Sequence, residues 1–299
     1  MNNKDSILIT GSSGQLAKEI KFLTKSTELF KNYRLLFLSK NSLDITKEDE
    51  VDTIFKTENI RAVINCAAYT NVDKAEEEAE LCFKVNNEGV RNLVKNASSY
   101  KCRMIHISTD YVFNGNKSIP WSEKDVPDPL NTYGKSKFAA ENLITSSNIN
   151  FAIIRTSWLY STFCNNFFNS ILRKIDNDED LEVVDDQIGS PTFAGDLAFF
   201  SIQILKKMFE SHDFREIFHY SNSGEASWFD FAVAIKKIHK ANAPIAIKRI
   251  KSSSLKLNAK RPKYTVLNNS KAENFLGRYI ENWESSLKKC YKFYLERPL

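Results

Sequence analysis

Tyr133 and Lys137, four residues apart, are the pair in this sequence best suited to move a proton. At that spacing on a helix, both side chains project from one face. A free tyrosine has a pKa of about 10, and a neighbouring ammonium group lowers that pKa by favouring the phenolate. In a chain with 11 tyrosines and many lysines, the spacing arises by chance about once. The surrounding sequence must therefore support the role.

Residues 106–110, His-Ile-Ser-Thr-Asp, close a predicted strand and supply that support. A hydroxyl at Thr109 can bond both a tyrosine oxygen and a substrate carbonyl, which completes a Thr109, Tyr133 and Lys137 catalytic set. We interpret His106 as a core histidine. The four histidines form no metal-ligand pattern, so no metal site is expected.

A glycine turn follows the first predicted strand, as Thr10-Gly11-Ser12-Ser13-Gly14-Gln15-Leu16-Ala17. Gly11 and Gly14 let the backbone turn sharply and approach a pyrophosphate, and the helix that follows offers unpaired amides and a favourable dipole. This pattern predicts a dinucleotide site. The second strand ends at Ser39 and Lys40 instead of the acidic residue typical of NAD enzymes. A hydroxyl and an ammonium favour NADPH, with NADH left open.

The first half alternates short apolar runs with amphipathic stretches, which indicates an α/β fold with a doubly wound parallel sheet. Motifs at the carboxyl ends of its strands would face one crevice. The predicted strands are 6–10, 34–38, 62–65, 103–108 and 151–155, and the predicted helices are 15–23, 47–56, 72–85, 88–97 and 133–145.

Beyond Arg155 the alternation weakens, and helical segments at 167–175, 196–209 and 228–238 lack regular strands between them. We expect residues 1–155 to form a Rossmann NADP-binding domain. Residues 156–299 would form mainly a smaller α/β substrate-binding part, with segments that return to the Rossmann core.

Composition excludes several classes of protein. Five scattered cysteines without a Cys-x-x-Cys pair suggest neither a disulfide framework nor zinc, and they favour the reducing cytoplasm. No signal peptide or membrane span is apparent, so no membrane partner is expected. The net charge of +5 comes without a nucleic-acid motif, so no nucleic-acid partner is expected either.

At this point the sequence resembles the extended short-chain dehydrogenases, and among them the dTDP-4-dehydrorhamnose reductases. The likeness covers most of the chain, and several blocks in order are more specific than any one. The blocks are Leu43-Asp44-Ile45-Thr46, Ile64-Asn65-Cys66-Ala67-Ala68-Tyr69-Thr70, Val72-Asp73-Lys74-Ala75-Glu76, Ser108-Thr109-Asp110-Tyr111-Val112-Phe113, Pro129-Leu130-Asn131-Thr132-Tyr133-Gly134-Lys135-Ser136-Lys137, Arg155-Thr156-Ser157-Trp158-Leu159-Tyr160, Asn165-Asn166-Phe167, Asp186-Gln187-Ile188-Gly189-Ser190-Pro191-Thr192 and Arg261-Pro262.

The resemblance implies NADPH-dependent reduction of the C4 keto group of a nucleotide-linked 4-keto-6-deoxysugar, in deoxysugar synthesis for a surface polysaccharide. Tyr133 would protonate the developing alkoxide, Thr109 would orient the carbonyl, and Lys137 would tune Tyr133 and hold the nicotinamide ribose. The other implied contacts are Gly14, Gln15 and Leu16 at the pyrophosphate with Ser13 in the same turn, Asp44 and Ile45 at the adenine, Ala67, Ala68 and Tyr69 beside the nicotinamide, and Thr109, Asp110 and Trp158 at the sugar.

Some family members place glutamates around a magnesium ion at a dimer contact, so a homodimer is among the expectations. Glu19 matches one such glutamate, but Gly195 stands where another would be, which argues against a metal here. Cys66 and Ala17 also depart from the usual alanine and glycine, and both are small changes.

Alternative functions remain open on the sequence alone. Related dehydratases carry an Asp-Glu pair after the strand-end threonine, whereas this chain has Asp110-Tyr111 and so lacks the expected base. A reductase or epimerase-reductase for another nucleotide 4-keto sugar, UDP-linked or of the 6-deoxytalose type, stays open. So does a non-catalytic NADP-binding subunit like the regulatory β subunit of methionine adenosyltransferase, although the intact Thr109, Tyr133 and Lys137 set argues against it.

Overall fold

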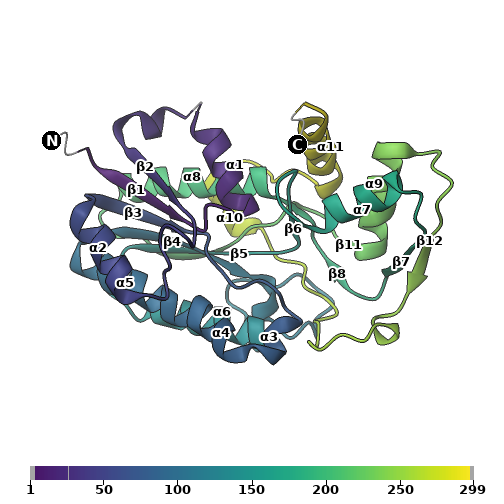
Figure 1. Ribbon diagram of the computed structural model, residues 1–299, viewed down its shortest axis with the longest axis horizontal. Helices are drawn as coiled ribbons and strands as arrows, with labels where there is room; N and C mark the ends of the chain where they lie inside the picture. The colour runs from purple at the N-terminus through teal and green to yellow at the C-terminus, as the bar shows by residue number, and fades with distance from the viewer. Residues whose placement is uncertain (1–3, 26, 297–299) are drawn as a thin grey trace.

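The computed structural model describes residues 4–25 and 27–296 and centres on a six-stranded parallel sheet (Figure 1). The strands run in the order β10-β5-β4-β3-β1-β2. Their bounds are β1 Ser6–Thr10, β2 Arg34–Leu38, β3 Ile60–Asn65, β4 Arg103–Thr109, β5 Phe151–Thr156 and β10 Arg215–His219. The chain passes from β1 to β2 on one side of β1 and then crosses back to β3 on its other side. At this reversal of strand order a crevice opens beyond the carboxyl ends of β1 and β3.

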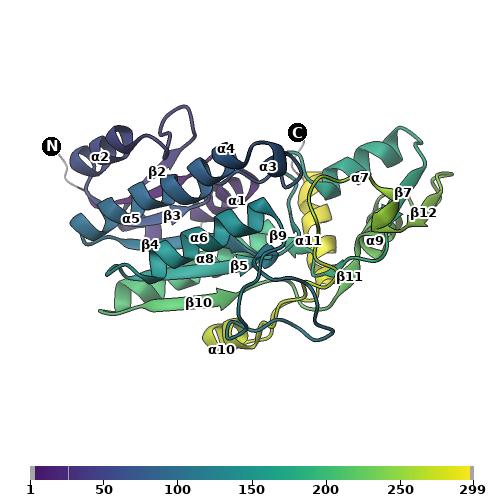
Figure 2. The ribbon, with the colours of Figure 1, turned by 90° about the horizontal axis from the view of Figure 1, so that it is seen from below.

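Helices cover both faces of the sheet, as a doubly wound sheet requires (Figures 1 and 2). Helices α1 (Gln15–Thr24) and α8 (Ala194–Glu210) pack together on one face, over alternate strand residues such as Ile7 and Ile9. On the other face Leu8 and Met104 pack against α2 (Glu48–Thr57), α5 (Gly89–Ser99) and α6 (Thr132–Thr145). The strands are apolar on both faces for this reason, and the predicted fold class is confirmed.

A smaller part follows β5 and has a core of its own. Aromatic and aliphatic side chains pack between α7 (Phe167–Asp176), α9 (Trp228–Lys240) and α11 (Trp283–Glu296). Short strands complete it, with β7 (Leu181–Val184) parallel to β12 (Ile247–Ile250), β8 (Ile188–Gly189) paired with β11 (Ala226–Ser227), and β6 (Leu159–Tyr160) paired with β9 (Thr192–Phe193). The short helix α10 (Ser270–Leu276) packs beside β10.

One strand of the main sheet is not predicted by the sequence pattern. β10 pairs in parallel with β5 and forms the sheet edge, although the second half was expected to lack regular strands. Arg215 and Glu216 open this strand and mask its apolar pattern, which an edge position tolerates. The 1–155 and 156–299 division stays a prediction, and β10 and α8 are later segments that lie on the core of the first half.

The predicted helix 88–97 is confirmed as α5, whereas the predicted helix 72–85 does not form one regular helix. The chain instead forms α3 (Lys74–Glu77), α4 (Ala79–Phe83) and a π-helical turn at Lys84–Glu88 that leads without a break into α5. Glu78 leaves helical geometry with φ −108° and ψ 43°, which separates α3 from α4. π turns inside helices are frequent at functional sites, and this one presents Asn86 toward the loop after β3.

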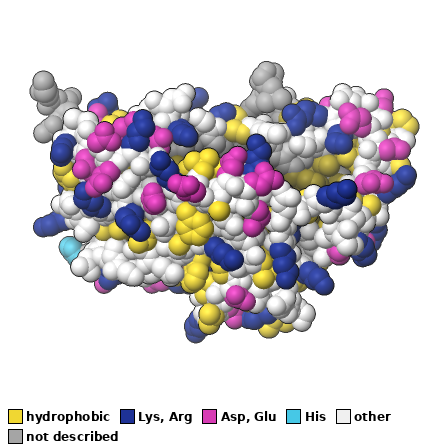
Figure 3. Space-filling view, turned by 60° about the horizontal axis from the view of Figure 1, so that its bottom comes forward, with side chains coloured by type: hydrophobic (Ala, Val, Ile, Leu, Met, Phe, Trp, Pro, Cys, Tyr) yellow, Lys and Arg dark blue, Asp and Glu magenta, His cyan; other side chains and the backbone are white. Residues whose placement is uncertain are grey.

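The surface carries charges of both signs. On the face shown in Figure 3, basic and acidic side chains are interspersed and hydrophobic ones lie between them. Within the described residues, no helix combines the length and apolar character needed to cross a bilayer.

Candidate active site

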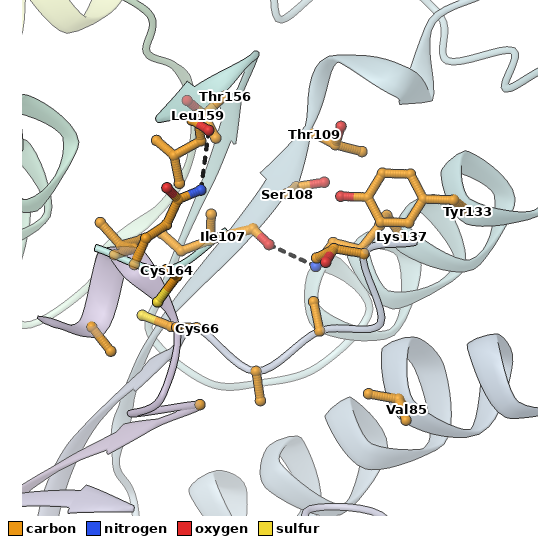
Figure 4. A pocket seen from close by; sticks show the side chains of 18 of the residues that line it. Cys66, Val85, Ile107, Ser108, Thr109, Tyr133, Lys137, Thr156, Leu159 and Cys164 are labelled. Atoms are coloured by element: carbon orange, nitrogen blue, oxygen red, sulfur yellow. Dashed lines mark hydrogen bonds between the residues drawn. The ribbon is translucent and has the colours of Figure 1, made fainter. Parts of the chain in front are cut away.

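A cavity of about 620 Å³ lies at the carboxyl ends of β1, β3, β4 and β5 and reaches the smaller part. That volume is within the usual range for a small-molecule site. Figure 4 shows part of its lining, with the Tyr133 hydroxyl facing inward beside Thr109 and Ser108. The predicted site residues that line it are Gly11, Ser13, Gly14, Gln15, Leu16, Lys40, Asp44, Ile45, Ala67, Ala68, Thr109, Asp110, Tyr133, Lys137 and Trp158.

The glycine turn is built for close backbone approach. Gly11 has φ +64°, and a Cβ there would lie 2.7 Å from the backbone of Ala67. Helix α1 begins directly after Gly14 with no acidic residue in its first turn, so its free amides and dipole favour an anion. These features fit the pyrophosphate of a dinucleotide.

Two predicted cofactor residues, Ser39 and Tyr69, are not among the residues that line the cavity. The carbonyl of Ser39 accepts hydrogen bonds from the amides of Ser42 and Leu43 in a turn. The Tyr69 hydroxyl donates to the Glu78 carboxylate at 2.6 Å. Their expected cofactor contacts stay predictions, while Lys40, beside Ser39, does line the cavity.

The π turn explains how the loop after β3 keeps its shape. Asn86 is fully buried, and its amide oxygen accepts from the Tyr69 backbone N–H at 2.8 Å while its nitrogen donates to the Tyr69 carbonyl at 3.0 Å. The same nitrogen donates to the Ser136 hydroxyl on α6 at 2.9 Å. The loop that carries Ala67 and Ala68 is thereby tied to the helix that carries Tyr133.

Thr109 ends β4 and begins a short helical turn, Asp110–Val112. Its hydroxyl donates to Asp110 Oδ1 at 3.0 Å and accepts from the Tyr111 amide at 3.1 Å. Asp110 is buried, and burial raises the pKa of its carboxyl to about 7, with Thr265 and Thr109 acting in the opposite direction. Near neutral pH, this carboxyl exchanges between its acid and its carboxylate form.

Tyr133 does not show the lowered pKa expected from the sequence. Withdrawal from water raises the pKa of its hydroxyl well above 10, and Thr109 opposes this only in part. Lys137 does not point its charge at this hydroxyl, since its Nζ donates to the Ile107 carbonyl at 2.6 Å (Figure 4) and contacts His106 Nε2 at 3.1 Å. Tyr133 is therefore a phenol at neutral pH, which is the form that can give a proton.

Trp158 forms a wall of the cavity and is held there by its neighbours. Its backbone has φ +45°, in the left-handed region that non-glycine residues seldom adopt. Its ring stacks on Trp228 with centroids 3.6 Å apart and planes 6° apart. A Cβ at Gly189 would lie 2.5 Å from the ring, so only glycine leaves room for it. Strain maintained by surrounding contacts is common at functional sites.

The two parts of the chain meet at the glycine turn. Gln15 donates to the Leu159 carbonyl at 3.0 Å and accepts from Asn166 at 3.1 Å. Asn166 also caps α7 by accepting from the Asn169 amide. The cofactor turn and the smaller part therefore hold each other in place.

Sequence reasoning missed several residues of the cavity wall. Trp228 comes from α9, far along the chain, and no sequence pattern predicts that it lines the cavity. Arg261 was noted only within a matching block, yet its guanidinium lines the cavity while donating to Asp73 at 2.6 Å. Val85 reaches the cavity because it lies in the unforeseen π turn.

Within residues 4–25 and 27–296, no cluster of three or more His, Cys, Asp or Glu side chains is arranged to hold a metal. Glu19 is buried and accepts from the Ser161 hydroxyl at 2.7 Å. At Gly195 a Cβ would lie 2.4 Å from the Phe193 ring.

Comparisons with known proteins find the same family by sequence and by structure. A family model described as the RmlD substrate binding domain matches residues 5–295. A dTDP-4-dehydrorhamnose reductase from Aggregatibacter actinomycetemcomitans is 37% identical over 289 residues, covering 94% of this chain and 97% of that protein. The crystal structure of a dTDP-4-dehydrorhamnose reductase ortholog from Clostridium acetobutylicum matches with a TM-score of 0.89 and 36% identity, covering 98% and 100% of the two chains. The crystal structure of a dTDP-4-dehydrorhamnose reductase from Bacillus anthracis in complex with NADP matches with a TM-score of 0.87 and 33% identity. The match covers 97% of this chain and 99% of that chain.

Proposed function

The chain belongs to the RmlD substrate binding domain family, and from that premise we propose that it is an NADPH-dependent dTDP-4-dehydrorhamnose reductase. The observation that carries this proposal is that Thr109, Tyr133 and Lys137 line the same cavity as the glycine turn. A proton donor and a dinucleotide cradle in one cavity are what carbonyl reduction requires.

Each member of the set has a role that its surroundings support. Tyr133, a phenol at neutral pH, gives its proton to the oxygen at C4 of the sugar as negative charge develops there. Thr109 turns its single hydroxyl proton from Asp110 Oδ1 to the same oxygen and so orients the carbonyl. Lys137 holds the ribose next to the nicotinamide through an N–H that its contacts with β4 leave available.

NADPH would supply the hydride. Gly11, Gly14 and the amides that open α1 would hold its pyrophosphate. Lys40 would pair with the 2′-phosphate, and Asp44 and Ile45 would border the adenine. Ser39 lies beside Lys40 but does not line the cavity, and its contact with the 2′-phosphate stays a prediction.

The sugar occupies the end of the cavity between β4 and the smaller part. Trp158 packs its ring against the deoxysugar, and Asp110 accepts bonds from sugar hydroxyls. Five free cysteines support a cytoplasmic location. The expected homodimer stays a prediction.

The arrangement around Asp110 favours a reductase over a dehydratase. Tyr111 occupies the position of the dehydratase glutamate, and burial raises the pKa of its phenol to about 12. Its ring packs edge-on against Tyr133, with centroids 6.0 Å apart. A buried phenol of this kind is a poor base for 4,6-dehydration.

An NADPH oxidation assay with dTDP-4-dehydrorhamnose tests the proposal, with UDP-linked 4-keto-6-deoxyhexoses as the comparison panel. We expect turnover with the dTDP-linked sugar and a product whose C4 carries a hydroxyl. If the protein binds NADPH but reduces no 4-keto sugar nucleotide, the non-catalytic alternative is favoured.

A further inference from the structure

Thr109 and Asp110 share one hydroxyl hydrogen at the end of β4. Thr109 has a single hydroxyl hydrogen, and it donates that hydrogen to Asp110 Oδ1 at 3.0 Å. The Thr109 oxygen accepts from the Tyr111 amide at 3.1 Å, so one of its two lone pairs stays free. A substrate carbonyl can only accept, and it therefore receives the Thr109 hydrogen only when Asp110 gives it up.

The charge of Asp110 decides how firmly it holds this hydrogen. A carboxylate can only accept, and its charge makes the hydrogen bond from Thr109 a strong one. A carboxylic acid is a weaker acceptor, and its own O–H can donate to the free lone pair of Thr109. Protonation of Asp110 therefore releases the Thr109 hydrogen for another acceptor.

Thr109 faces the cavity beside Tyr133. The two hydroxyls lie next to each other in Figure 4, and the hydrogen bond between them is one of the influences on the pKa of Tyr133. The oxygen at C4 of the sugar would lie against both groups, since Tyr133 must give it a proton. A hydrogen that leaves Asp110 is thus directed at the atom on which negative charge develops.

Burial keeps the acid form of Asp110 populated near neutral pH. The side chain is 2% exposed, and burial is the largest influence on its pKa. The hydroxyls of Thr265 and Thr109 and two backbone amides act against burial, and none of these groups is charged. The pKa of the carboxyl is accordingly about 7, so acid and carboxylate are both present in this range.

The charged and titratable neighbours of Asp110 leave this balance in place. Tyr111 on the same turn and Tyr133 on α6 have pKa values that burial raises, so both are neutral phenols. Arg261, from the segment that follows β12, contacts Tyr111 and pairs with Asp73 at 2.6 Å. Its charge is therefore paired with a carboxylate other than Asp110.

We propose that Asp110 is a positioning residue for Thr109, which in its acid form frees the Thr109 hydroxyl to donate to the substrate oxygen and in its carboxylate form keeps that hydroxyl turned away. The inference rests on the proposed reductase function and adds a control to it. Thr109 acts on the carbonyl only while Asp110 is protonated, so its contribution to the rate falls as pH rises.

The cost of removing the Thr109 hydroxyl tests this role, as the ratio of kcat/KM between the unaltered protein and Thr109→Val at one pH. Lys137 also titrates in this range, with a pKa of about 8, but its effect cancels in the ratio because both proteins carry it. We expect Thr109→Val to lower kcat/KM by about 10² at pH 6 and by less than about tenfold at pH 9, where Asp110 is a carboxylate. An equal cost at both pH values overturns the proposal.

Two further variants assign the effect to this pair of residues. Asp110→Asn fixes a neutral group beside Thr109, and in that background Thr109→Val should cost the same at pH 6 and pH 9. Thr109→Ser keeps the hydroxyl and should show the pH dependence of the unaltered protein. If the cost in the Asp110→Asn background still falls with pH, another group controls Thr109 and the proposal is wrong. Fluorescence titration with NADPH shows at each pH that every variant is folded.

A titration without substrate tests the contact itself. Full-length protein is labelled with ¹³C at Cγ of aspartate, and the Asp110 signal is assigned from Asp110→Asn. We expect a midpoint near 7, raised by about half a unit or more in Thr109→Val, because the carboxylate loses a donor, and kept in Thr109→Ser. An unchanged midpoint in Thr109→Val overturns the contact. If the unaltered protein reduces no sugar nucleotide, the reductase proposal fails, while this titration still decides whether Thr109 and Asp110 are coupled.

Discussion

At the scale of single residues, Asp110 and Lys137 are each 2% exposed, and burial is the largest influence on the pKa of both. It raises the pKa of the carboxylic acid and lowers that of the ammonium, because the charged form loses solvation in each case. Tyr133 follows the same rule as an acid. The site therefore favours neutral groups, which suits a step in which a proton moves as charge develops on the substrate.

Asp110 makes the stability of the protein depend on pH. Its folded pKa of about 7 lies above the ordinary value of 3.8, so between these values the folded state binds more protons, and stability falls as pH rises. We expect Asp110→Asn to raise the free energy of unfolding relative to the unaltered protein by about 4 kcal/mol at pH 8, and by little at pH 4. Urea unfolding at the two pH values measures this. A difference that is the same at both would show that Asp110 ionises normally in the fold.

Trp158 should affect the sugar and leave the cofactor alone. Its ring is stacked on Trp228 and confined by Gly189, so it presents a fixed apolar face to the cavity. We expect Trp158→Ala to raise KM and lower kcat, with kcat/KM falling at least about tenfold, because a sugar free to rock aligns poorly. NADPH affinity, measured by fluorescence titration, should barely change. Unaltered kinetics in a destabilised protein would instead assign Trp158 to packing alone.

At the scale of elements, α6 carries Tyr133 and Lys137, and a buried ion pair attaches it to the sheet. Arg155 on β5 donates to Glu141 on α6 at 2.6 Å, with the two side chains 3% and 2% exposed. Ser108 on β4 donates to the same carboxylate. This attachment sets the height of α6 over the strand that carries Thr109.

We expect Glu141→Leu to lower the free energy of unfolding by about 3–5 kcal/mol, because Arg155 is left as an unpaired buried charge. The double variant Glu141→Leu, Arg155→Leu should recover much of that loss, since neither charge then remains. Urea unfolding of the single and double variants gives both values. A double variant less stable than Glu141→Leu would show that the charge on Arg155 is stabilised by other groups.

The elements of the first half were readable in the sequence because each strand is apolar on both faces and each motif follows a strand end. Strand β2 was placed with its observed bounds, and the glycine turn was placed where α1 begins. The π turn at Lys84–Glu88 was not, because its shape depends on Asn86 bonding the loop at Tyr69, a contact that no local pattern encodes. The contact between Trp158 and Trp228 depends in the same way on how α9 packs.

The partners of the Lys137 side chain also could not be predicted from the sequence. Spacing correctly placed Lys137 and Tyr133 at one cavity, but the predicted lowering of the tyrosine pKa was wrong. The lysine nitrogen is bound by Ile107 and His106 on the neighbouring strand. Side chains on one helix face can be predicted from period, whereas their partners across the fold require the tertiary structure.

At the scale of the whole molecule, the cavity is shared between the sheet and the smaller part. The sheet contributes the glycine turn and the Thr109, Tyr133 and Lys137 set, while the smaller part contributes Trp228. Gln15 joins the two by its bonds to Leu159 and Asn166. These hydrogen bonds therefore fix the part of the cavity that would hold the sugar relative to the glycine turn that would hold the cofactor.

Reduction at C4 of a dTDP-linked 4-keto-6-deoxysugar in this shared cavity is measured by following the hydride from NADPH to the sugar. NADPH that carries two deuterium atoms at C4 of the nicotinamide is incubated with dTDP-4-dehydrorhamnose, and the product is examined by NMR. We predict deuterium at C4 of the sugar with the unaltered protein, and a rate about 10² to 10⁴ lower in Tyr133→Phe with NADPH binding retained. No deuterium at C4, or a near-normal rate in Tyr133→Phe, would contradict the account.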